Sequence, residues 1–347
     1  MDMLAARLYG KDDLRVERIP VPEIADDEIL VKVKAAAVCG TDLRMLANGQ
    51  SGVDAEHPVV LAHEFAGVIE KAGSRVKGYA PGQRVSVAPN IGCGICDFCV
   101  SGKSHHCKSL IALGIHMDGG FAEYVRVPAQ AVKLGNVTPL DDAVTFEAAA
   151  ANEAFACVYN AFERYGVRPG ETVVIVGAGA IGMMHAKLAK MSGAAKIILN
   201  DLSEQRLAEC AALDPELIIV KDDLPGRVNA LTNGRGADVV ITACSAAAAQ
   251  RGAFALAGID GRVNFFGGLP KGKENVELDT NVIHYKQLSV TGTTRSSHGQ
   301  YRQTLRFIAS GLVDVDSLVT HCWPLQDVLK AFDNAANGVG LKQAIVF

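Results

Sequence analysis

The stretch of residues 172–201 constrains the fold more than any other part of the chain. It begins with five apolar or β-branched residues, 172–176, which is the length of a buried strand. Gly177, Gly179 and Gly182 follow as Gly-x-Gly-x-x-Gly, and a helical pattern then leads to a second apolar run. Bare matches to this glycine pattern are often ordinary loops. The strand before it and the helix after it, however, predict a dinucleotide-binding βαβ unit.

The glycines and the first helical turn meet separate physical needs of a dinucleotide. Gly177 makes the tight turn from strand to helix, Gly179 lets a pyrophosphate approach the backbone, and Gly182 lets helix and strand pack closely. Ala180 and Ile181 lie in the first turn, where unpaired N–H groups and the positive end of the helix dipole face the phosphates. The sequence therefore predicts all five residues as cofactor contacts.

The acidic residue Asp201 ends the second apolar run. A carboxylate there accepts hydrogen bonds from the ribose hydroxyls and repels a 2′-phosphate, which favours NAD over NADP. Arg206, a few residues on, either reaches the ribose or a phosphate or is a surface arginine. Ligands bind at the carboxyl edge of a parallel sheet, so the later strand ends at Cys244 and at Gly267 and Gly268 are predicted nicotinamide contacts.

The composition narrows the class of protein. A length of 347 residues suits two domains, and 49% hydrophobic with 21% charged residues is typical of a globular chain. A net charge of −4 and a pI near 6.1 predict neither a nucleic-acid partner nor an anionic membrane partner. We find no signal-peptide pattern and no membrane-length apolar run, and the clustered cysteines favour a reducing compartment. We therefore expect a cytoplasmic protein.

The two parts of the chain differ in their periodicity. Residues 1 to about 150 show short alternating runs separated by turns, for example 27–36, which predict a compact, barrel-like β-rich domain. Beyond the glycine pattern, apolar runs at 217–220, 236–242 and 261–268 alternate with helical segments, which predicts a doubly wound parallel sheet and an α/β fold class. From about residue 288 the pattern changes, and we expect this tail to return to the first domain.

Two short motifs carry a candidate catalytic metal site. Cys39 begins Cys-Gly-Thr-Asp, and His63 is followed directly by Glu64. A thiolate, an imidazole and a carboxylate are ligands that a catalytic zinc takes while one position stays open. Glu153 lies on an otherwise apolar helical face, where a charge is costly unless a nearby metal pairs with it. A capping or solvated glutamate is the alternative for Glu153.

The cysteine spacing C-x2-C-x2-C-x7-C is the most specific local motif. It is formed by Cys93, Cys96, Cys99 and Cys107. Four thiolates at this spacing can close on one tetrahedral structural zinc, and an iron–sulfur cluster is the less favoured alternative. His57 and His116 lie outside both metal motifs and are interpreted as structural or surface residues.

Taken in order and spacing, these motifs resemble the zinc-dependent medium-chain dehydrogenase/reductase family. The resemblance is strongest to its polyol (sorbitol, iditol, galactitol) dehydrogenase branch, with threonine dehydrogenases as near relatives. It covers essentially the whole chain, including residues 118–124 and 319–325. It implies a GroES-like catalytic domain from residues 1–152 and 289–347 and a Rossmann domain from 153–288. It further implies an active site in the cleft between them and a homodimer or homotetramer.

The resemblance also implies roles for the metal-site residues. Cys39 and His63 match the zinc ligands, and Glu64 matches the acid beside the metal. Glu153 stands where alcohol dehydrogenases place a cysteine ligand; in the polyol branch this glutamate often holds the zinc-bound water or ligates directly. The glutamate therefore favours polyol over simple-alcohol oxidation.

The residues around these ligands include one informative departure from the family pattern. Thr41 matches the hydroxyl that passes the substrate proton on, and Asp42 matches the acid that orients the histidine ligand. Ala62 and Ala154 replace a usual glycine and a usual proline. Arg44 stands where many members carry the histidine that ends the proton relay, and arginine cannot act as a base at neutral pH. This departure weakens the match to threonine dehydrogenases.

The sequence as a whole predicts an NAD- and zinc-dependent dehydrogenase. We expect it to convert a secondary hydroxyl of a small polyol or sugar-like substrate to a ketone, with one catalytic and one structural zinc ion. L-Threonine or a simple alcohol is the alternative substrate. A non-catalytic NAD- and zinc-binding sensor is the alternative from another class, but a pure binder need not keep the set of residues that turnover requires.

Overall fold

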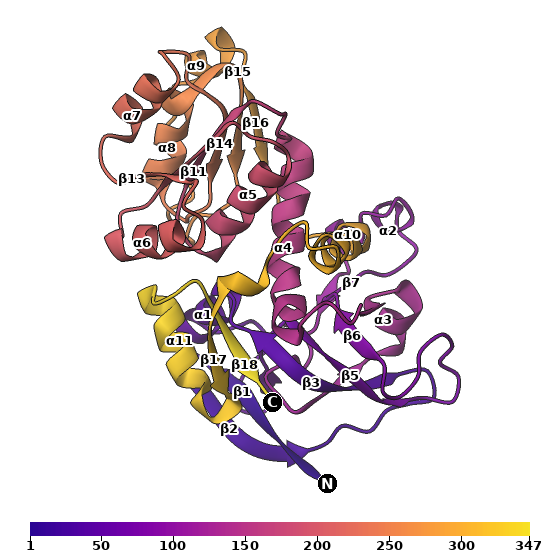
Figure 1. The fold of residues 1–347 in the computed structure, drawn as a ribbon. Helices are drawn as coiled ribbons and strands as arrows, with labels where there is room; N and C mark the ends of the chain where they lie inside the picture. The colour runs from indigo at the N-terminus through magenta and orange to yellow at the C-terminus, as the bar shows by residue number, and fades with distance from the viewer. The chain divides into compact units, whose positions relative to one another are not determined.

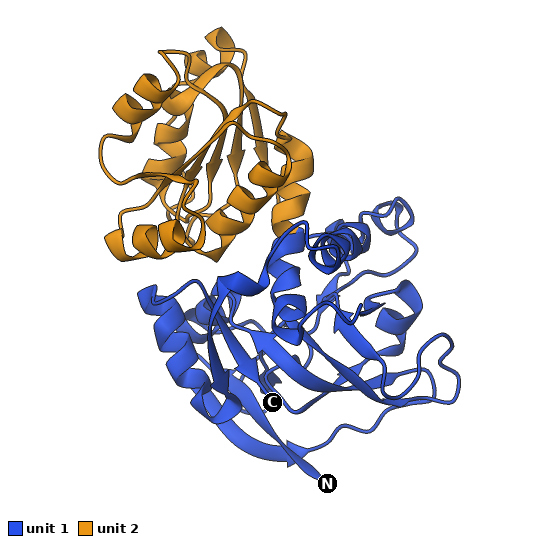
Figure 2. Cartoon of the chain, viewed as in Figure 1, with its two compact units in different colours: residues 1–156, 296–347 blue, residues 157–295 orange.

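The computed structural model describes residues 1–347, and the chain forms two compact units (Figure 2). Unit 1 comprises Met1–Ala156 and Ser296–Phe347, and unit 2 comprises Cys157–Arg295. Helix α4 (Phe146–Tyr165) runs from one unit into the other. No helix has the length and apolar character that a membrane crossing requires.

Unit 1 is rich in β-structure (Figure 1). One sheet has the order β2-β1-β4, a seven-stranded sheet has the order β10-β6-β5-β3-β18-β17 with β9 also paired to β3, and β7 pairs with β8. The strands are β1 (Asp2–Gly10), β2 (Asp13–Pro20), β3 (Ile29–Ala37), β4 (Val59–Val60), β5 (Phe65–Ala72), β6 (Arg84–Val87), β7 (Asn90–Ile91), β8 (Ile111–Ala112), β9 (Tyr124–Val127), β10 (Val137–Pro139), β17 (Val319–Pro324) and β18 (Lys342–Val346). The helices and 3-10 turns are α1 (Gly40–Asn48), α2 (Asp97–Val100), η1 (Ser104–His106), α3 (Ala129–Leu134), α10 (His298–Ala309), η2 (Asp316–Leu318), η3 (Leu325–Asp327) and α11 (Val328–Asn337).

Strand β3 is the centre of the larger sheet. It pairs antiparallel with β5, β9 and β18, so Ala37 lies opposite Ala344 near the C-terminus. Its side chains are mostly buried, and the core beside it includes Phe65 and Phe121, both fully buried. The last strand of the chain is therefore part of the sheet that carries the first metal-site motif.

Unit 2 contains a parallel sheet of the order β13-β12-β11-β14-β15-β16. Its strands are largely runs of apolar residues, because helices cover both faces of such a sheet. Its elements are β11 (Thr172–Val176), α5 (Ala180–Met191), β12 (Lys196–Asn200), α6 (Glu204–Leu213), β13 (Ile218–Val220), α7 (Leu224–Leu231), β14 (Ala237–Thr242), α8 (Ala247–Leu256), β15 (Ala257–Phe265), α9 (Thr280–Tyr285) and β16 (Ser289–Gly292). This sheet confirms the predicted α/β fold class.

The strand order of unit 2 reverses between β11 and β14. Helix α5 packs on β11 and β12, and α8 packs on β14 and β15 (Figure 1). Because the chain moves outward in opposite directions from the reversal, right-handed crossovers place these helices on opposite faces. A reversal of this kind opens a crevice at the carboxyl ends of the strands.

One boundary drawn from the sequence differs from the division into units. The expected boundary after residue 288 assigns the last parallel strand to the catalytic domain. In the structure β16 pairs with β15, Val290 lying opposite Val263, so it belongs to the sheet of unit 2. A four-residue strand carries no pattern that tells which sheet it joins.

Candidate functional site

The first metal-site motifs meet at one point of unit 1. Cys39 follows β3 and is the N-cap residue of α1, while His63 and Glu64 lie between β4 and β5. The donor atoms of these three side chains all lie within 4.8 Å of one another. His63 and Glu64 are buried, and Cys39 is half-buried.

The buried carboxylate of Asp42 ties the two segments together. Its Oδ2 accepts a hydrogen bond from the Cys39 N–H at 2.8 Å, and its Oδ1 accepts one from the Ala62 N–H at 3.4 Å. The same Oδ1 lies 3.8 Å from His63 Nδ1. Burial raises the pKa of Asp42, although His63 and the two backbone bonds act against this shift.

Ala62, which replaces a usual glycine, has φ +72°. This left-handed conformation favours glycine and costs a residue with a Cβ about 1 kcal/mol or more. The strain is held because the Ala62 N–H is bonded to Asp42 and its carbonyl accepts the Gly120 N–H at 2.8 Å. A Cβ on Gly119 would overlap the same carbonyl, so the turn before Gly120 packs directly on the segment that carries His63.

Glu153 approaches this group from α4. It is buried, and its Oε2 lies 4.0 Å from His63 Nε2. Burial by itself lowers the pKa of His63, but Cys39, Asp42 and Glu153 raise it well above its ordinary value. The imidazole therefore lies in a negative potential that a bound cation would neutralise.

The donor set fits a zinc ion. Glu64 Oε1 is buried without a hydrogen-bond partner. Buried polar atoms are normally satisfied, so an orphaned oxygen beside a thiol and an imidazole indicates a missing ligand. Sulfur, nitrogen and carboxylate oxygen are the donors that zinc takes.

Lys342 contacts the candidate metal site, and the sequence did not reveal it. It is buried on β18, and its Nζ lies 2.6 Å from Glu64 Oε2. Burial lowers the pKa of Lys342, but Glu64, Cys39 and Glu153 together raise it above its ordinary value, so the ammonium is retained. A lysine in a C-terminal apolar run was the only signal, and it does not say which acid the lysine meets.

Thr41 and Arg44 lie on one face of α1. The Arg44 guanidinium donates a hydrogen bond from Nη2 to Thr41 Oγ1 at 2.9 Å. Thr41 is half-buried and Arg44 is exposed. The residue at the expected relay position thus contacts the hydroxyl but can only donate to it.

The second metal group is the four-cysteine lobe. The sulfurs of Cys93, Cys96, Cys99 and Cys107 all lie within 4.8 Å of one another, and Cys93 Sγ is 4.0 Å from Cys99 Sγ. Zinc–sulfur bonds of about 2.3 Å place tetrahedral ligands roughly 3.8 Å apart, so the sulfurs fit one zinc ion. Backbone N–H groups of Ile95 and Cys96 lower the pKa of Cys93 to about 6, whereas burial raises the pKa of Cys99 to about 12.

The glycine turn of unit 2 has a geometry suited to a dinucleotide. Gly177 has φ +118°, and a Cβ on Gly182 would overlap the Gly177 carbonyl. Gly179 is the N-cap residue of α5, and a Cβ added there would meet open space. The backbone between Gly179 and Ile181 is therefore accessible to a phosphate at the start of a twelve-residue helix.

Asp201 lies beside this turn. Its Oδ2 accepts the Ala178 N–H at 2.8 Å and its Oδ1 accepts the Ser203 N–H at 2.9 Å. Each carboxylate oxygen has a second lone pair that remains available to a ribose hydroxyl. Arg206 lies on α6, half-buried, and its backbone N–H is bonded to the capping Ser203 hydroxyl.

The other predicted nicotinamide contacts lie at the same edge of the sheet. The position of a Gly177 Cβ would be 3.3 Å from the Cys244 Cβ. The Gly267 N–H donates to the Thr242 carbonyl at 3.0 Å, which draws the ends of β14 and β15 together. A Cβ on Gly268 would meet open space. Burial raises the pKa of the Cys244 thiol, which keeps it protonated.

Comparisons with known proteins agree with this geometry. The family model for the alcohol dehydrogenase GroES-like domain matches residues 25–136, and that for zinc-binding dehydrogenase matches residues 180–310. A sorbitol dehydrogenase of Bombyx mori is 32% identical over 346 residues, covering 97% of each chain. An L-threonine 3-dehydrogenase of Bacillus licheniformis is 33% identical over 333 residues, covering 95% of this chain and 94% of that protein.

A solved structure is similar over the full length. It is a Sinorhizobium meliloti protein described as a zinc-binding dehydrogenase and bound to NADP. The TM-score is 0.89 at 30% sequence identity, with 100% of both chains covered.

Proposed function

The chain belongs to the zinc-binding dehydrogenases, and from this premise we propose that it oxidises a secondary hydroxyl of a neutral polyol to a ketone with NAD. The observation that carries the proposal is the buried group of Cys39, His63 and Glu64, with a carboxylate, Glu153, 4.0 Å from His63. A zinc ion held there supplies a Lewis acid for the hydroxyl oxygen, and the nicotinamide supplies the hydride acceptor.

The residues of this chain position the alcohol and carry its proton. Thr41 lies two residues after Cys39, so its Oγ can accept the hydroxyl proton of an alcohol held at the metal group. Arg44 only donates, and therefore the proton leaves Thr41 to water at the exposed face of α1. Asp42 keeps His63 in place through its two backbone hydrogen bonds.

A polyol is favoured over L-threonine and simple alcohols for two reasons. Glu153 replaces the cysteine ligand of simple-alcohol enzymes, and Arg44 replaces the relay histidine found in many members, including the threonine dehydrogenases. Relatives named for both sorbitol and L-threonine are similarly close, at 32% and 33% identity. The residues at the site, rather than the overall identity, therefore support the choice.

NAD is favoured over NADP by Asp201, although the Sinorhizobium meliloti protein was solved with NADP. A carboxylate beside the glycine turn repels a 2′-phosphate. We predict that Asp201→Ala weakens NAD binding about tenfold or more, the loss expected for a hydrogen bond to a charged group. The same change should raise the relative use of NADP. Asp214→Ala, at the C-terminal end of α6, is the control, and an unchanged cofactor preference in Asp201→Ala would contradict the assignment.

The proposed reaction is tested with a substrate panel. Initial rates of NADH formation are compared for sorbitol and other polyols, L-threonine, 2-propanol and primary alcohols. We expect the highest kcat/KM with one or a few polyols. A higher value with L-threonine or 2-propanol would overturn the substrate assignment, and no turnover in protein that holds zinc and binds NAD would favour the sensor alternative.

The edge strand of unit 2 supports a homodimer. The outer edge of β16 carries no charged residue and no proline, and natural proteins normally protect such an edge. Ile259 and Tyr285 near it are 80% and 78% exposed. Two copies of β16 can pair antiparallel about a two-fold axis, which satisfies both edges. Val290→Lys should shift the protein to monomers in light scattering, and an unchanged mass would contradict this mode of pairing.

A further inference from the structure

The catalytic metal group of unit 1 is assembled from two separate elements. His63 and Glu64 directly precede β5 in the larger sheet, whereas Glu153 belongs to α4. The distance of 4.0 Å between His63 Nε2 and Glu153 Oε2 therefore depends on how α4 is placed against the sheet. A displacement of about 1 Å at a catalytic group can cost about a hundredfold in rate, so the contacts that set this placement bear on function.

Apolar packing does little to fix α4 along its axis. The buried surfaces that meet between α4 and the sheet consist largely of alanine methyl groups, from Ala148, Ala149 and Ala150 on α4 and from Ala35, Ala37, Ala66 and Ala88 on or beside the strands. The hydrophobic effect is non-directional, and small side chains interlock little. The position of the helix therefore depends on directional contacts.

The buried hydroxyl of Ser86 provides one such contact. Ser86 lies on β6 opposite Ala66, which follows Glu64 by two residues. Its Oγ donates a hydrogen bond to the Ala149 carbonyl at 3.1 Å. In an α-helix the same carbonyl accepts the N–H four residues on, which is that of Glu153. One carbonyl thus joins the sheet to the helical turn that carries the second carboxylate.

Tyr301 on α10 completes this connection. Its side chain is fully buried, and its hydroxyl lies 2.6 Å from Ser86 Oγ. Because the one hydrogen of the serine hydroxyl is donated to the Ala149 carbonyl, the phenol must donate to the serine. The Tyr301 backbone carbonyl also accepts a hydrogen bond at 3.1 Å from Nδ2 of Asn152, the neighbour of Glu153. Helix α10 is therefore bonded to this turn of α4 both directly and through Ser86 (Figure 1).

The electrostatic surroundings keep the phenol of Tyr301 neutral. Burial raises its pKa, and the carboxylates of Glu153 and Glu64 add to the shift. Hydrogen bonds from Ser86 and Asn152 act against it without reversing it. The phenol therefore retains its hydrogen, and it lies within the field of both carboxylates of the metal group.

We propose that Tyr301 is a positioning residue for the metal group. The chain of hydrogen bonds from the Tyr301 hydroxyl through Ser86 to the Ala149 carbonyl holds the turn of α4 that carries Glu153. Hydrogen bonds in such a chain polarise and strengthen one another. The inference rests on the proposed function, because it takes Glu153 as part of the catalytic group.

The first test removes one hydroxyl group. In Tyr301→Phe we expect the dissociation constant of the more weakly bound zinc, measured by competition with a chelator, to rise about 3- to 10-fold, the loss expected for one hydrogen bond. The value of kcat/KM for sorbitol should fall by a similar factor. Tyr79→Phe is the matched control, since this tyrosine of unit 1 donates to the Val137 carbonyl at 2.9 Å. It should leave both quantities unchanged.

A double-mutant cycle separates positioning of Glu153 from a general structural role. In a Glu153→Ala background the carboxylate that Tyr301 positions is absent, so Tyr301→Phe should have no further effect on the zinc dissociation constant. The same 3- to 10-fold rise in both backgrounds would overturn the proposal, because Tyr301 would then act independently of Glu153.

Ser86→Ala covers the case in which Tyr301→Phe does not fold. It removes the middle of the chain of hydrogen bonds and should weaken zinc binding in the same direction. Unchanged zinc affinity and kcat/KM in folded Tyr301→Phe and Ser86→Ala would overturn the positioning role and leave the proposed oxidation standing. Absence of polyol turnover in the wild type would overturn the proposed function, and the zinc affinities would then decide on Tyr301 alone.

Discussion

The two metal groups of unit 1 share cysteine ligands and are otherwise built in opposite ways. The group at Cys39 is surrounded by buried charge, with Glu153 4.0 Å from His63 and Lys342 2.6 Å from Glu64. Three side chains are grouped there, against four in the lobe, which leaves a fourth tetrahedral position open for chemistry. Its segments are tied into the sheet through β3, β5 and β18, so the fold around it has its own apolar core.

The four-cysteine lobe has little apolar core of its own. Ile95, Phe98 and Val100 are 85%, 43% and 70% exposed. Its helix α2 has four residues and no buried residue. Four thiolates close the coordination of a zinc ion, which leaves no position for a substrate. The difference teaches that one metal serves a reaction within a pre-formed site, and the other replaces the hydrophobic core that the lobe lacks.

The largest expected effect is on stability, and it comes from removing a zinc ligand of the four-cysteine lobe. Cys96→Ser removes one of four ligands, and loss of a structural metal belongs to the most destabilising class of changes, about 4 kcal/mol or more. We expect one zinc per chain to be lost and the melting temperature to fall. Cys322→Ser, an exposed cysteine outside the lobe, is the control. Unchanged zinc content and melting temperature in Cys96→Ser would show that the lobe does not need the Cys96 ligand to fold.

A smaller loss is expected at the buried charge pair of the catalytic group. Lys342→Met leaves Glu64 without its cation and should cost about 3–5 kcal/mol of unfolding free energy in chemical denaturation. Adding Glu64→Gln should recover most of that loss, since no buried charge is then left unpaired. Lys330→Met removes an exposed pair with Asp327 and should cost less than about 1 kcal/mol. An equal cost in Lys342→Met and Lys330→Met would mean that Glu64 is not held as an anion by Lys342.

Glu153→Cys changes the chemistry of the catalytic group more than its stability. A thiolate in place of the carboxylate should lower the ratio of kcat/KM for sorbitol to that for 2-propanol by about tenfold, the scale of changes next to a metal. Glu147→Cys, six residues earlier on α4, controls for the new thiol. A ratio that stays constant would remove Glu153 from the determinants of substrate choice.

The smallest effect is predicted within the lobe itself. Ile95→Ser should change the unfolding free energy by no more than about 0.5 kcal/mol, because the side chain is 85% exposed. Calorimetry of the zinc-loaded protein measures this directly. A large loss would mean that apolar contacts, rather than the metal, hold the lobe.

Local sequence patterns predicted the parts of the site that are built from neighbouring residues. The lobe cysteines and the turn from Gly177 to Gly182 lie within single short segments, so spacing alone indicates their geometry. Lys342 could not be predicted, because it meets Glu64 only through the pairing of β18 with β3, which joins the two ends of the chain.

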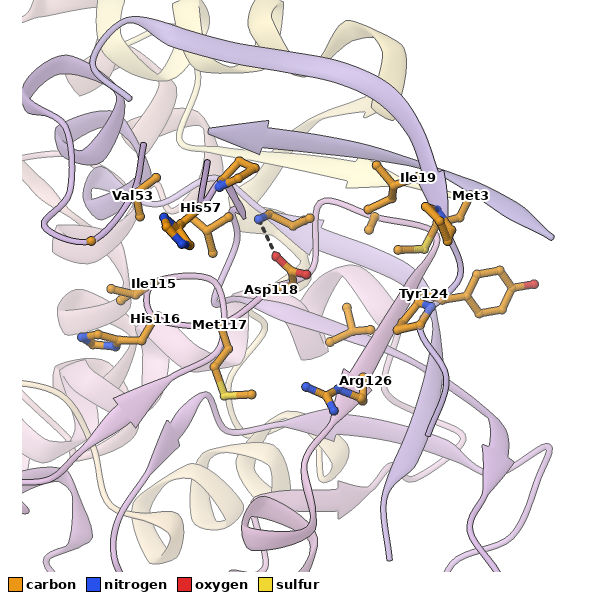
Figure 3. Close-up of a pocket in the computed structure, with 18 of the residues that line it drawn as sticks. Met3, Ile19, Val53, His57, Ile115, His116, Met117, Asp118, Tyr124 and Arg126 are labelled. Carbon is orange, nitrogen blue, oxygen red and sulfur yellow. Dashed lines mark hydrogen bonds between the residues drawn. The ribbon is translucent and has the colours of Figure 1, made fainter. Parts of the chain in front are cut away.

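The pairing of distant segments also places residues that sequence reasoning left outside the site. His57 and His116 were interpreted as surface or structural residues; both are exposed, and both line one cavity (Figure 3) because the segment at Val60 runs beside Asp118. Their tautomers depend on Asp54 and on the Ala112 N–H, neither of which a sequence pattern specifies. A sequence pattern gives residue types and their spacing, whereas the position of the hydrogen on a histidine ring depends on the contacts that the ring makes in the folded protein.

The most direct test of the contrast between the two groups is stepwise removal of zinc. Zinc per chain, NADH formation with sorbitol and the melting temperature are followed together during mild chelation and on zinc addition. We predict that activity disappears with the first zinc released while the melting temperature is largely kept, and that loss of the second zinc unfolds the lobe. Activity that persists after the first zinc is gone, or a melting temperature that falls in step with activity, would contradict the account.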